Sequence, residues 1–247
     1  MVNLEVSIST RIAVIADVHS NARALGRVLE DIQRRGIQQI INLGDSVYGP
    51  LEPARTLALL RAAQVRSVAG NEDRILDLPD SVVARHPTIR FTLSELSATD
   101  QEELRALPAL LWVYSTVLAC HGTPSSDNTY LLESVSETGA HLSRPEAIRS
   151  LLEMNDEAGR AEVILCAHSH LARAVWLDET FIVNPRSVGL PAYADTVPCP
   201  HAMEAGSPHA RYAILNSDTD GWEVEQVALP YDWQAAADLA LKNGRPD

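Results

Sequence analysis

The segment IAVIADVHSN (residues 12–21) sets five small or branched apolar residues directly before a polar cluster. A short apolar run of this length and branching is typical of a buried β-strand. After the cluster, apolar residues recur at the spacing of one helix face, and Gly36 ends the pattern. The residues of that face are Leu25, Val28, Leu29 and Ile32. The segment therefore predicts a strand, a polar turn and a helix, the repeating unit of α/β folds.

The same succession of apolar run, polar cluster and helix signal recurs along the chain. Four further strand-like runs are predicted at residues 40–43, 65–69, 112–120 and 163–167, and each ends in a polar cluster. Helices are predicted over residues 55–63, 99–107, 145–154 and 233–241. These alternating signals predict an α/β architecture, which we assign to a single domain over residues 1–247.

The last third of the chain has a different pattern, with strand signals close together. Residues 172–177 and 180–183 predict one hairpin, and residues 211–216 and 222–229 predict a second. Between them, residues 190–210 contain four prolines and few apolar runs. We therefore expect a long surface loop there, near the site, and a loop of that length is often functional.

Composition limits the classes of protein and partner. The chain has 247 residues, 46% of them hydrophobic, and a formal net charge of −13. So acidic a protein offers no broad surface to a nucleic-acid backbone, so we expect no extended nucleic-acid binding. The three cysteines do not form a disulfide framework, and no secretory leader or membrane-spanning stretch is evident. We therefore expect a cytoplasmic protein with no membrane contact.

The polar clusters contain side chains that bind metal ions. In open α/β sheets, ligands bind beyond the carboxyl ends of the strands, so the five clusters are expected to converge. Together they supply seven candidate ligands: Asp17, His19, Asp45, Asn71, His121, His168 and His170. Carboxylate, amide and imidazole without thiolate favour manganese, with iron or zinc as alternatives. Seven ligands suit two divalent ions that share a carboxylate.

Each cluster also has a simpler interpretation when it is considered alone. Asp17 caps the following helix in that interpretation, because Asp is preferred there. Gly44-Asp45 is an ordinary turn, and His121 follows an apolar run as a buried core histidine does. The metal interpretation rests on five such endings occurring in order along one chain.

The complete set of motifs resembles one family. The sequences DVH, GDSVYGP, GNED, HGTP and HSH resemble those of the calcineurin-like metallophosphoesterases. IADVHSNARAL, VNPRSVGLP and LPYDWQAAADLAL resemble its small bacterial and archaeal branch of predicted phosphodiesterases. The resemblance implies a four-layer α/β/β/α sandwich, with two facing mixed sheets, helices outside, and metals at one edge between the sheets.

The resemblance also implies a role for each candidate ligand. Asp17, His19 and His170 would hold the first metal. Asn71, His121 and His168 would hold the second, and Asp45 would bridge the two. A hydroxide between the metals would attack the phosphorus, and Asn71 would also act in catalysis by touching the phosphate.

Two positions depart from the family pattern. Many relatives have a histidine at the position of Glu72, where it is thought to assist the leaving group. A carboxylate beside two cations favours its charged form and donates a proton poorly, so Glu72 is a weaker candidate for this catalytic role. Arg186 stands where the branch has glycine, and its guanidinium would either bind a substrate phosphate bidentately or form a surface ion pair.

The expected activity is therefore metal-dependent hydrolysis of a phosphodiester or a nucleotide pyrophosphate link in a small phosphorylated substrate, such as a nucleotide. Two alternatives remain open at this stage. One is a phosphoprotein or monoester phosphatase, and the other is a non-catalytic metal-binding scaffold of the same fold.

Overall fold

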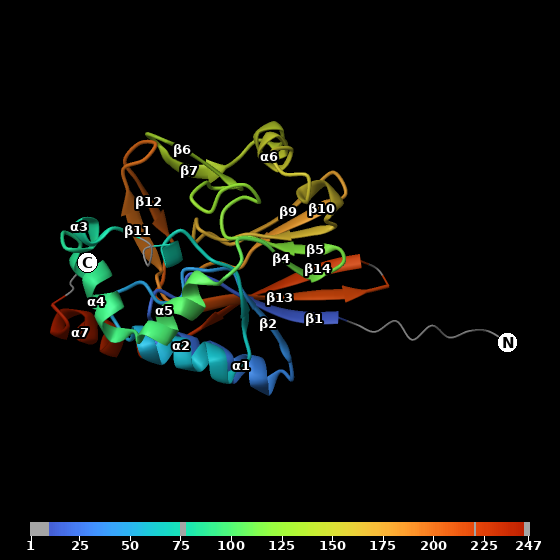
Figure 1. Cartoon of the computed structure of the whole chain (residues 1–247). Helices are drawn as coiled ribbons and strands as arrows, with labels where there is room; N and C mark the ends of the chain where they lie inside the picture. Colours follow the sequence, from blue (N-terminus) through green and yellow to red (C-terminus); the bar gives the residue numbers. More distant parts are fainter. Residues whose placement is uncertain (1–9, 75–77, 220, 245–247) are drawn as a thin grey trace.

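Two five-stranded mixed sheets form the centre of the computed structural model, which describes residues 10–74, 78–219 and 221–244 (Figure 1). The first sheet has the order β14 (Gly221–Leu229), β13 (Ala210–Asp218), β1 (Thr10–Ile15), β2 (Gln39–Asn42) and β3 (Arg66–Ser67). The second has the order β4 (Leu111–Tyr114), β5 (Val117–Ala119), β8 (Val163–Leu165), β10 (Thr180–Asn184) and β9 (Arg173–Leu177).

The strands that precede the polar clusters are parallel within each sheet. In the first sheet β1, β2 and β3 are parallel, and β13 and β14 extend the sheet with antiparallel strands. In the second sheet β5, β8 and β10 are parallel, while β4 and β9 are antiparallel edge strands. Parallel strands of one sheet end at the same edge, so the clusters that follow β1, β2 and β3 are neighbours.

The continuous apolar run of β1 follows from burial on both faces of its sheet. Ile12 and Val14 belong to the core between the sheets, which Val163 and Val183 of the second sheet complete. Ala13 and Ile15 alternate with them and face the outer core. Because successive side chains of a strand point to opposite faces, a strand buried on both sides contains no polar alternation.

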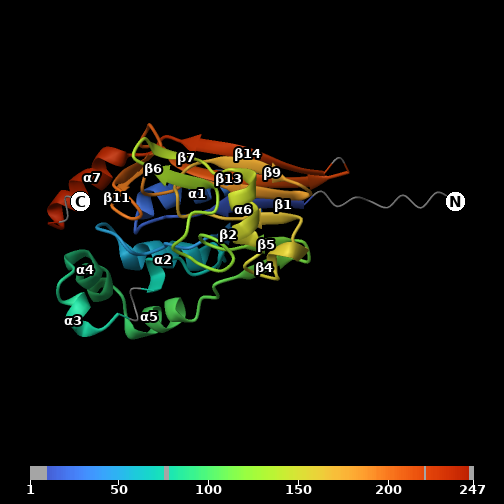
Figure 2. The ribbon, with the colours of Figure 1, turned by 90° about the horizontal axis from the view of Figure 1, so that it is seen from above.

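Helices cover the outer face of each sheet. Helices α1 (Ala22–Arg34) and α2 (Pro53–Ala62) pack on the first sheet through residues such as Val28 and Leu60. Helix α6 (Pro145–Leu152) packs on the second sheet through Ile148. Figure 1 shows the resulting order of helices, sheet, sheet and helix, and Figure 2 looks down onto the stacked layers, with α6 over the second sheet. The predicted four-layer α/β/β/α sandwich is therefore confirmed.

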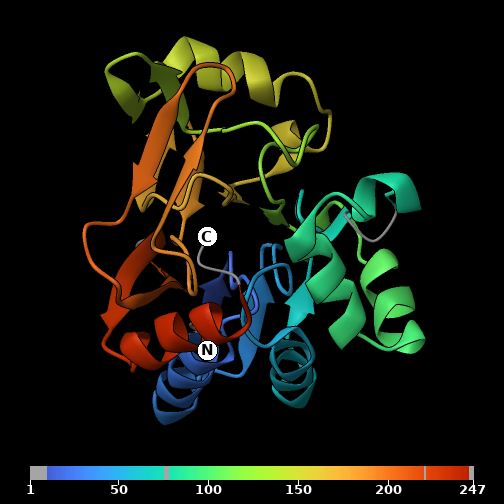
Figure 3. The same ribbon diagram turned by 90° about the vertical axis from the view of Figure 1, so that its left-hand side faces the viewer.

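Most of the remaining elements surround the edge at which the parallel strands end. They are α3 (Asp80–Val83), α4 (Pro87–Glu95), α5 (Ala98–Arg105), α7 (Trp233–Lys242), and the hairpins β6 (Glu133–Ser136) with β7 (Gly139–Leu142) and β11 (Ala192–Asp195) with β12 (His201–Glu204). The 3₁₀ helix η2 (Ala158–Arg160) comes just before β8 and lies at the opposite end of that strand. Figure 3 looks onto this edge and shows the β11–β12 hairpin (orange) on one side and helices α3 to α5 (green) on the other.

Three segments differ from the sequence-based expectation. The predicted single strand over residues 112–120 is two antiparallel strands, β4 and β5, which turn at Ser115 and Thr116 without glycine or proline. The predicted strand over residues 65–69 is reduced to the two residues of β3. Residues 190–210, expected as a surface loop, contain the β11–β12 hairpin, and all four prolines of the segment lie outside its paired residues.

No helix among the described residues combines the length and the apolar character needed to cross a membrane.

Candidate metal centre

The loops that follow the strands hold several candidate ligands in an uncommon backbone conformation. Positive φ angles occur at Asp17 (53°), His19 (47°), Asp45 (54°), His168 (67°) and His170 (55°). Non-glycine residues seldom adopt this left-handed conformation, and such strained residues gather at functional sites. Backbone hydrogen bonds hold the first two loops together, because Asp17 N donates to Gly44 O at 3.1 Å and His19 N donates to Asp45 O at 3.0 Å.

Glycine is required where the second and third loops meet. Gly44 has a φ of +101°, and a Cβ there would lie 2.5 Å from Gly70 N. A Cβ on Gly70 would overlap the Asp45 carboxylate. The close approach of these two loops brings Asp45 and Asn71 to the same place, which side chains at either glycine would prevent.

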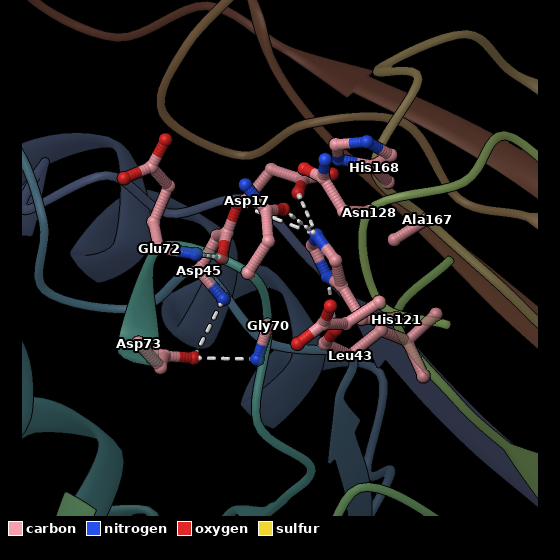
Figure 4. A network of polar contacts seen from close by, with 12 residues as sticks. Asp17, Leu43, Asp45, Gly70, Glu72, Asp73, His121, Asn128, Ala167 and His168 are labelled. Carbon is pink, nitrogen blue, oxygen red and sulfur yellow. Dashed lines mark hydrogen bonds and ion pairs between the residues drawn. The ribbon is translucent and has the colours of Figure 1, made fainter. Parts of the chain in front are cut away.

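The structure brings all seven candidate ligands together. Two groups have ligand atoms that lie within 4.8 Å of one another, namely Asp17, His19 and His170, and Asp45, His121 and His168. Asn71 adjoins the second group, with Oδ1 2.9 Å from His121 Nε2. Figure 4 shows Asp17 of the first group beside Asp45 and His121 of the second.

Asp45 lies between the two groups. Its Oδ2 atom is 3.3 Å from His121 Nε2 and 4.0 Å from His19 Nε2. A single carboxylate oxygen therefore faces one imidazole from each group, as a ligand shared by two ions does.

The Asp17 carboxylate provides the test of whether a cation fits. The side chain is completely buried, and neither oxygen accepts a hydrogen bond from the described residues. Nε2 of His170 lies 3.5 Å from Oδ1. A buried carboxylate without donors is costly, and a divalent cation bound at these oxygens removes that cost. The donor set and this carboxylate therefore fit a divalent metal ion.

Backbone carbonyls orient three of the four histidines. Nδ1 of His121 lies 2.7 Å from Leu43 O, and Nδ1 of His170 lies 2.9 Å from Leu190 O. Nδ1 of His19 lies 3.3 Å from the carbonyl oxygen of residue 48. A carbonyl only accepts hydrogen bonds, so each Nδ1 carries a proton and Nε2 is the nitrogen that can bind a metal once it is unprotonated.

The ionisation of these groups is strongly coupled. Burial disfavours the charged carboxylate of Asp45, but His121 and His19 outweigh it and lower the pKa of Asp45. Burial opposes the charge on His121 as well, yet the Asp45 carboxylate raises the pKa of His121 to about 10. Burial lowers the pKa of His19 and of His168 to about 4. In the metal-free chain His121 therefore carries the positive charge that a cation would supply.

Asp73 was given no role from the sequence, although it completes the motif GNED. Its carboxylate is buried and accepts three backbone hydrogen bonds, from Asp45 N (2.9 Å), Ser46 N (3.2 Å) and Gly70 N (2.9 Å), as Figure 4 shows in part. Burial and the neighbouring Asp45 raise the pKa of Asp73 to about 6. Asp73 therefore joins the loop of Asp45 to the loop of Asn71.

Glu72 lies at the rim of the centre. Its backbone N–H donates to Asp45 Oδ1 at 2.9 Å, while Figure 4 shows its carboxylate extending away from Asp45. Burial, Asp45 and Asp73 raise the pKa of Glu72 to about 7. Two bound cations would act in the opposite direction and favour the charged carboxylate.

Arg186 lies in the loop that supports Asp17. The next residue, Ser187, donates from Oγ to Asp17 O at 2.8 Å. The Arg186 guanidinium donates from Nη2 to Ala205 O at 3.0 Å, while its Nε is buried without a partner. Within the described part of the chain no carboxylate forms an ion pair with Arg186, so the surface ion pair that was one expectation for this residue does not occur there.

Comparison with known proteins identifies a family. The model of the calcineurin-like phosphoesterase superfamily domain matches residues 10–202. An uncharacterized protein of Methanocaldococcus jannaschii is 26% identical, covering 97% of this chain and 96% of that protein. The crystal structure of a metallophosphoesterase from Sphaerobacter thermophilus has a TM-score of 0.73 at 24% identity, over 96% of this chain and 95% of that one. A hypothetical protein from Pyrococcus horikoshii has the same TM-score at 16% identity, over 96% and 94%.

Proposed function

This chain belongs to the calcineurin-like phosphoesterase superfamily, and from that premise we propose that it hydrolyses a phosphodiester or a nucleotide pyrophosphate link with two divalent metal ions. One observation carries the proposal: two adjoining groups of ligand side chains surround a buried Asp17 carboxylate that has no hydrogen-bond donor among the described residues. When bound, two ions stabilise negative charge on the phosphate and lower the pKa of water.

The residue roles follow from the two groups. We assign Asp17, His19 and His170 to one ion, because their ligand atoms form one group. Asn71, His121 and His168 are assigned to the other, and Asn71 is also assigned a contact with the substrate phosphate. Asp45 is assigned to both ions, since its Oδ2 faces an imidazole of each group.

Carboxylate, amide and imidazole ligands support manganese, with iron or zinc as alternatives.

The net effect of the charges supports a phosphorylated substrate despite the acidity of the chain. Two divalent ions contribute more positive charge than Asp17 and Asp45 contribute negative charge, so the field at the site becomes positive.

Two observations support a diester or pyrophosphate substrate over a monoester. Glu72 stands where the phosphatases that this chain resembles carry a histidine, and beside two cations it is a poor proton donor. A solved structure described as a putative diadenosine tetraphosphatase shares the fold, with a TM-score of 0.53 at 13% identity over 90% of this chain and 95% of that one. Such a fold likeness makes dinucleotides reasonable first substrates to assay.

The test is hydrolysis of bis-p-nitrophenyl phosphate by the metal-stripped chain, with manganese, iron(II), zinc and magnesium restored in turn. We expect metal-dependent turnover that falls by about 100-fold or more in Asp45→Asn, because loss of the shared carboxylate removes several kcal/mol of stabilisation. Asp156→Asn is the matched control, since it neutralises an exposed carboxylate.

A chain that binds two ions but turns over no diester or dinucleotide would overturn the proposed activity and favour the metal-binding scaffold. Faster hydrolysis of a phosphopeptide than of any diester would favour the phosphoprotein phosphatase. A screen of dinucleotides and cyclic nucleotides then defines the substrate.

A further inference from the structure

His168 differs from the other three candidate histidine ligands in how its ring is oriented. His19, His121 and His170 each donate from Nδ1 to a backbone carbonyl. The His168 ring makes no such hydrogen bond to any described residue. Its backbone also has a φ of +67°, so both its ring and its main chain need support from elsewhere.

Two tyrosines supply contacts at this position. The ring of Tyr130 stacks on the ring of His168, with centroids 4.7 Å apart and planes inclined by 28°. Tyr193 Oη donates to the backbone oxygen of His168 at 3.0 Å. The Tyr193 ring also meets the ring of His170 edge-on, with centroids 4.7 Å apart.

The two tyrosines contact each other, and both belong to or contact the β11–β12 hairpin: Tyr193 lies in β11, and Tyr130 contacts β12. Their hydroxyl oxygens lie 2.9 Å apart. Oη of Tyr130 also lies 3.2 Å from Nε2 of His201, a residue of β12 that is 8% exposed. His201 donates in turn from Nδ1 to Cys199 O at 2.8 Å. We call Tyr130, Tyr193 and His201 the aromatic clamp.

We propose that the aromatic clamp positions His168 for metal binding, with Tyr130 fixing its imidazole plane and Tyr193 fixing its backbone. The inference rests on the proposed function, because it assigns His168 to a metal ion. The stacked ring replaces the carbonyl that fixes each of the other three imidazoles, and ligands oriented in this way bind their metal more tightly. The β11–β12 hairpin is then part of the metal centre and not a cover over it.

The geometry makes the effect of Tyr130 selective. Tyr130 contacts the ring of His168, which belongs to the group with Asp45 and His121. The other group, Asp17, His19 and His170, has no ring contact with Tyr130 among the described residues. Loss of the Tyr130 ring should therefore lower the binding affinity for one ion and leave the affinity for the other almost unchanged. General destabilisation of the protein would lower both affinities.

The experiment is a titration of the metal-stripped chain with manganese, monitored by calorimetry and by electron paramagnetic resonance. In Tyr130→Leu we expect one of the two ions to bind about tenfold more weakly and the other to change by less than about twofold. Tyr130→Phe keeps the stacked ring and should restore most of the affinity. Tyr114→Leu, at a 42% exposed position of β4, is the matched control.

If folded Tyr130→Leu lost affinity equally for both ions, or lost none for either, the inference would be overturned. Tyr193→Phe removes one hydroxyl and serves if Tyr130→Leu does not fold, and unchanged manganese affinity there would also overturn it. Proton NMR of the metal-free chain separates the clamp from the proposed function: the ring-current shift of the His168 protons should disappear in Tyr130→Leu. A wild-type chain that showed this shift but bound no manganese would contradict the proposed function, and with it the positioning role.

Discussion

Nε2 of His121 lies 3.3 Å from Oδ2 of Asp45, and both side chains are almost completely buried. Asp45 thereby raises the pKa of His121 to about 10 against the opposing effect of burial. A cation between these atoms must displace the proton, because a protonated imidazole has no lone pair for a metal.

Metal binding at neutral pH should therefore release about one proton per chain from His121, and a further fraction of a proton from Glu72, whose pKa of about 7 the cations lower. His19 and His168 release none, because burial lowers their pKa values to about 4 and they are already neutral. The metal-free chain binds the extra proton up to pH about 10, so metal affinity should rise with pH until that value and then level off. Calorimetric titration in buffers of different ionisation enthalpy measures the released proton, and identical heats in all buffers would contradict this assignment.

Asp73→Asn tests the residue that joins two ligand loops. The carboxylate accepts from Asp45 N, Ser46 N and Gly70 N, and an asparagine amide would point its NH₂ group at one of these donors. We expect the free energy of unfolding to fall by about 1–3 kcal/mol and metal affinity to fall about tenfold or more. Denaturant unfolding and manganese titration measure the two effects, with Asp156→Asn as the control. Wild-type metal affinity in the variant would show that the loops keep their places without Asp73.

Glu72→His tests why a diester is the expected substrate. A histidine at the rim can donate a proton to a leaving group, which the charged glutamate cannot. Monoester hydrolysis, measured with p-nitrophenyl phosphate, should rise by about tenfold or more relative to diester hydrolysis. Glu72→Gln controls for the loss of charge and should show no such rise. If the two variants behaved alike, charge and not proton donation would explain the preference.

Arg186→Gln tests the proposed phosphate contact. The guanidinium donates to Ala205 O and has no carboxylate partner among the described residues, so no carboxylate competes with an anion for it. We expect KM to rise about tenfold for a dinucleotide with several phosphates, and kcat to change little. Arg85→Gln, at an exposed position, is the control. A KM that did not change for any phosphorylated substrate would leave Arg186 with its hydrogen bond to Ala205 O as its only function.

Periodicity predicted the elements in which buried residues recur at the regular spacing of a helix or a strand. The helix face of Leu25, Val28, Leu29 and Ile32 became α1, and the two hairpins of the last third became β9–β10 and β13–β14. The turn between β4 and β5 escaped prediction because Ser115 and Thr116 interrupt the apolar run without the glycine, proline, asparagine or aspartate that would mark a tight turn. The β11–β12 hairpin escaped it because short strands between prolines depend on pairing that the local sequence does not display.

Sequence alone determined the candidate ligands of the proposed centre: their residue types, their order, and their places at the ends of apolar runs. This was possible because a strand's burial and the turn that follows it are local properties. The grouping of the candidate ligands and the shared role of Asp45 were implied by the family resemblance, and the tertiary structure supplies the distances that agree with them. Only the tertiary structure revealed the contacts of Asp73, Tyr130 and Tyr193 with these residues. Those contacts join residues far apart in the chain, and their energies come from burial and hydrogen bonds that exist only once the two sheets face each other.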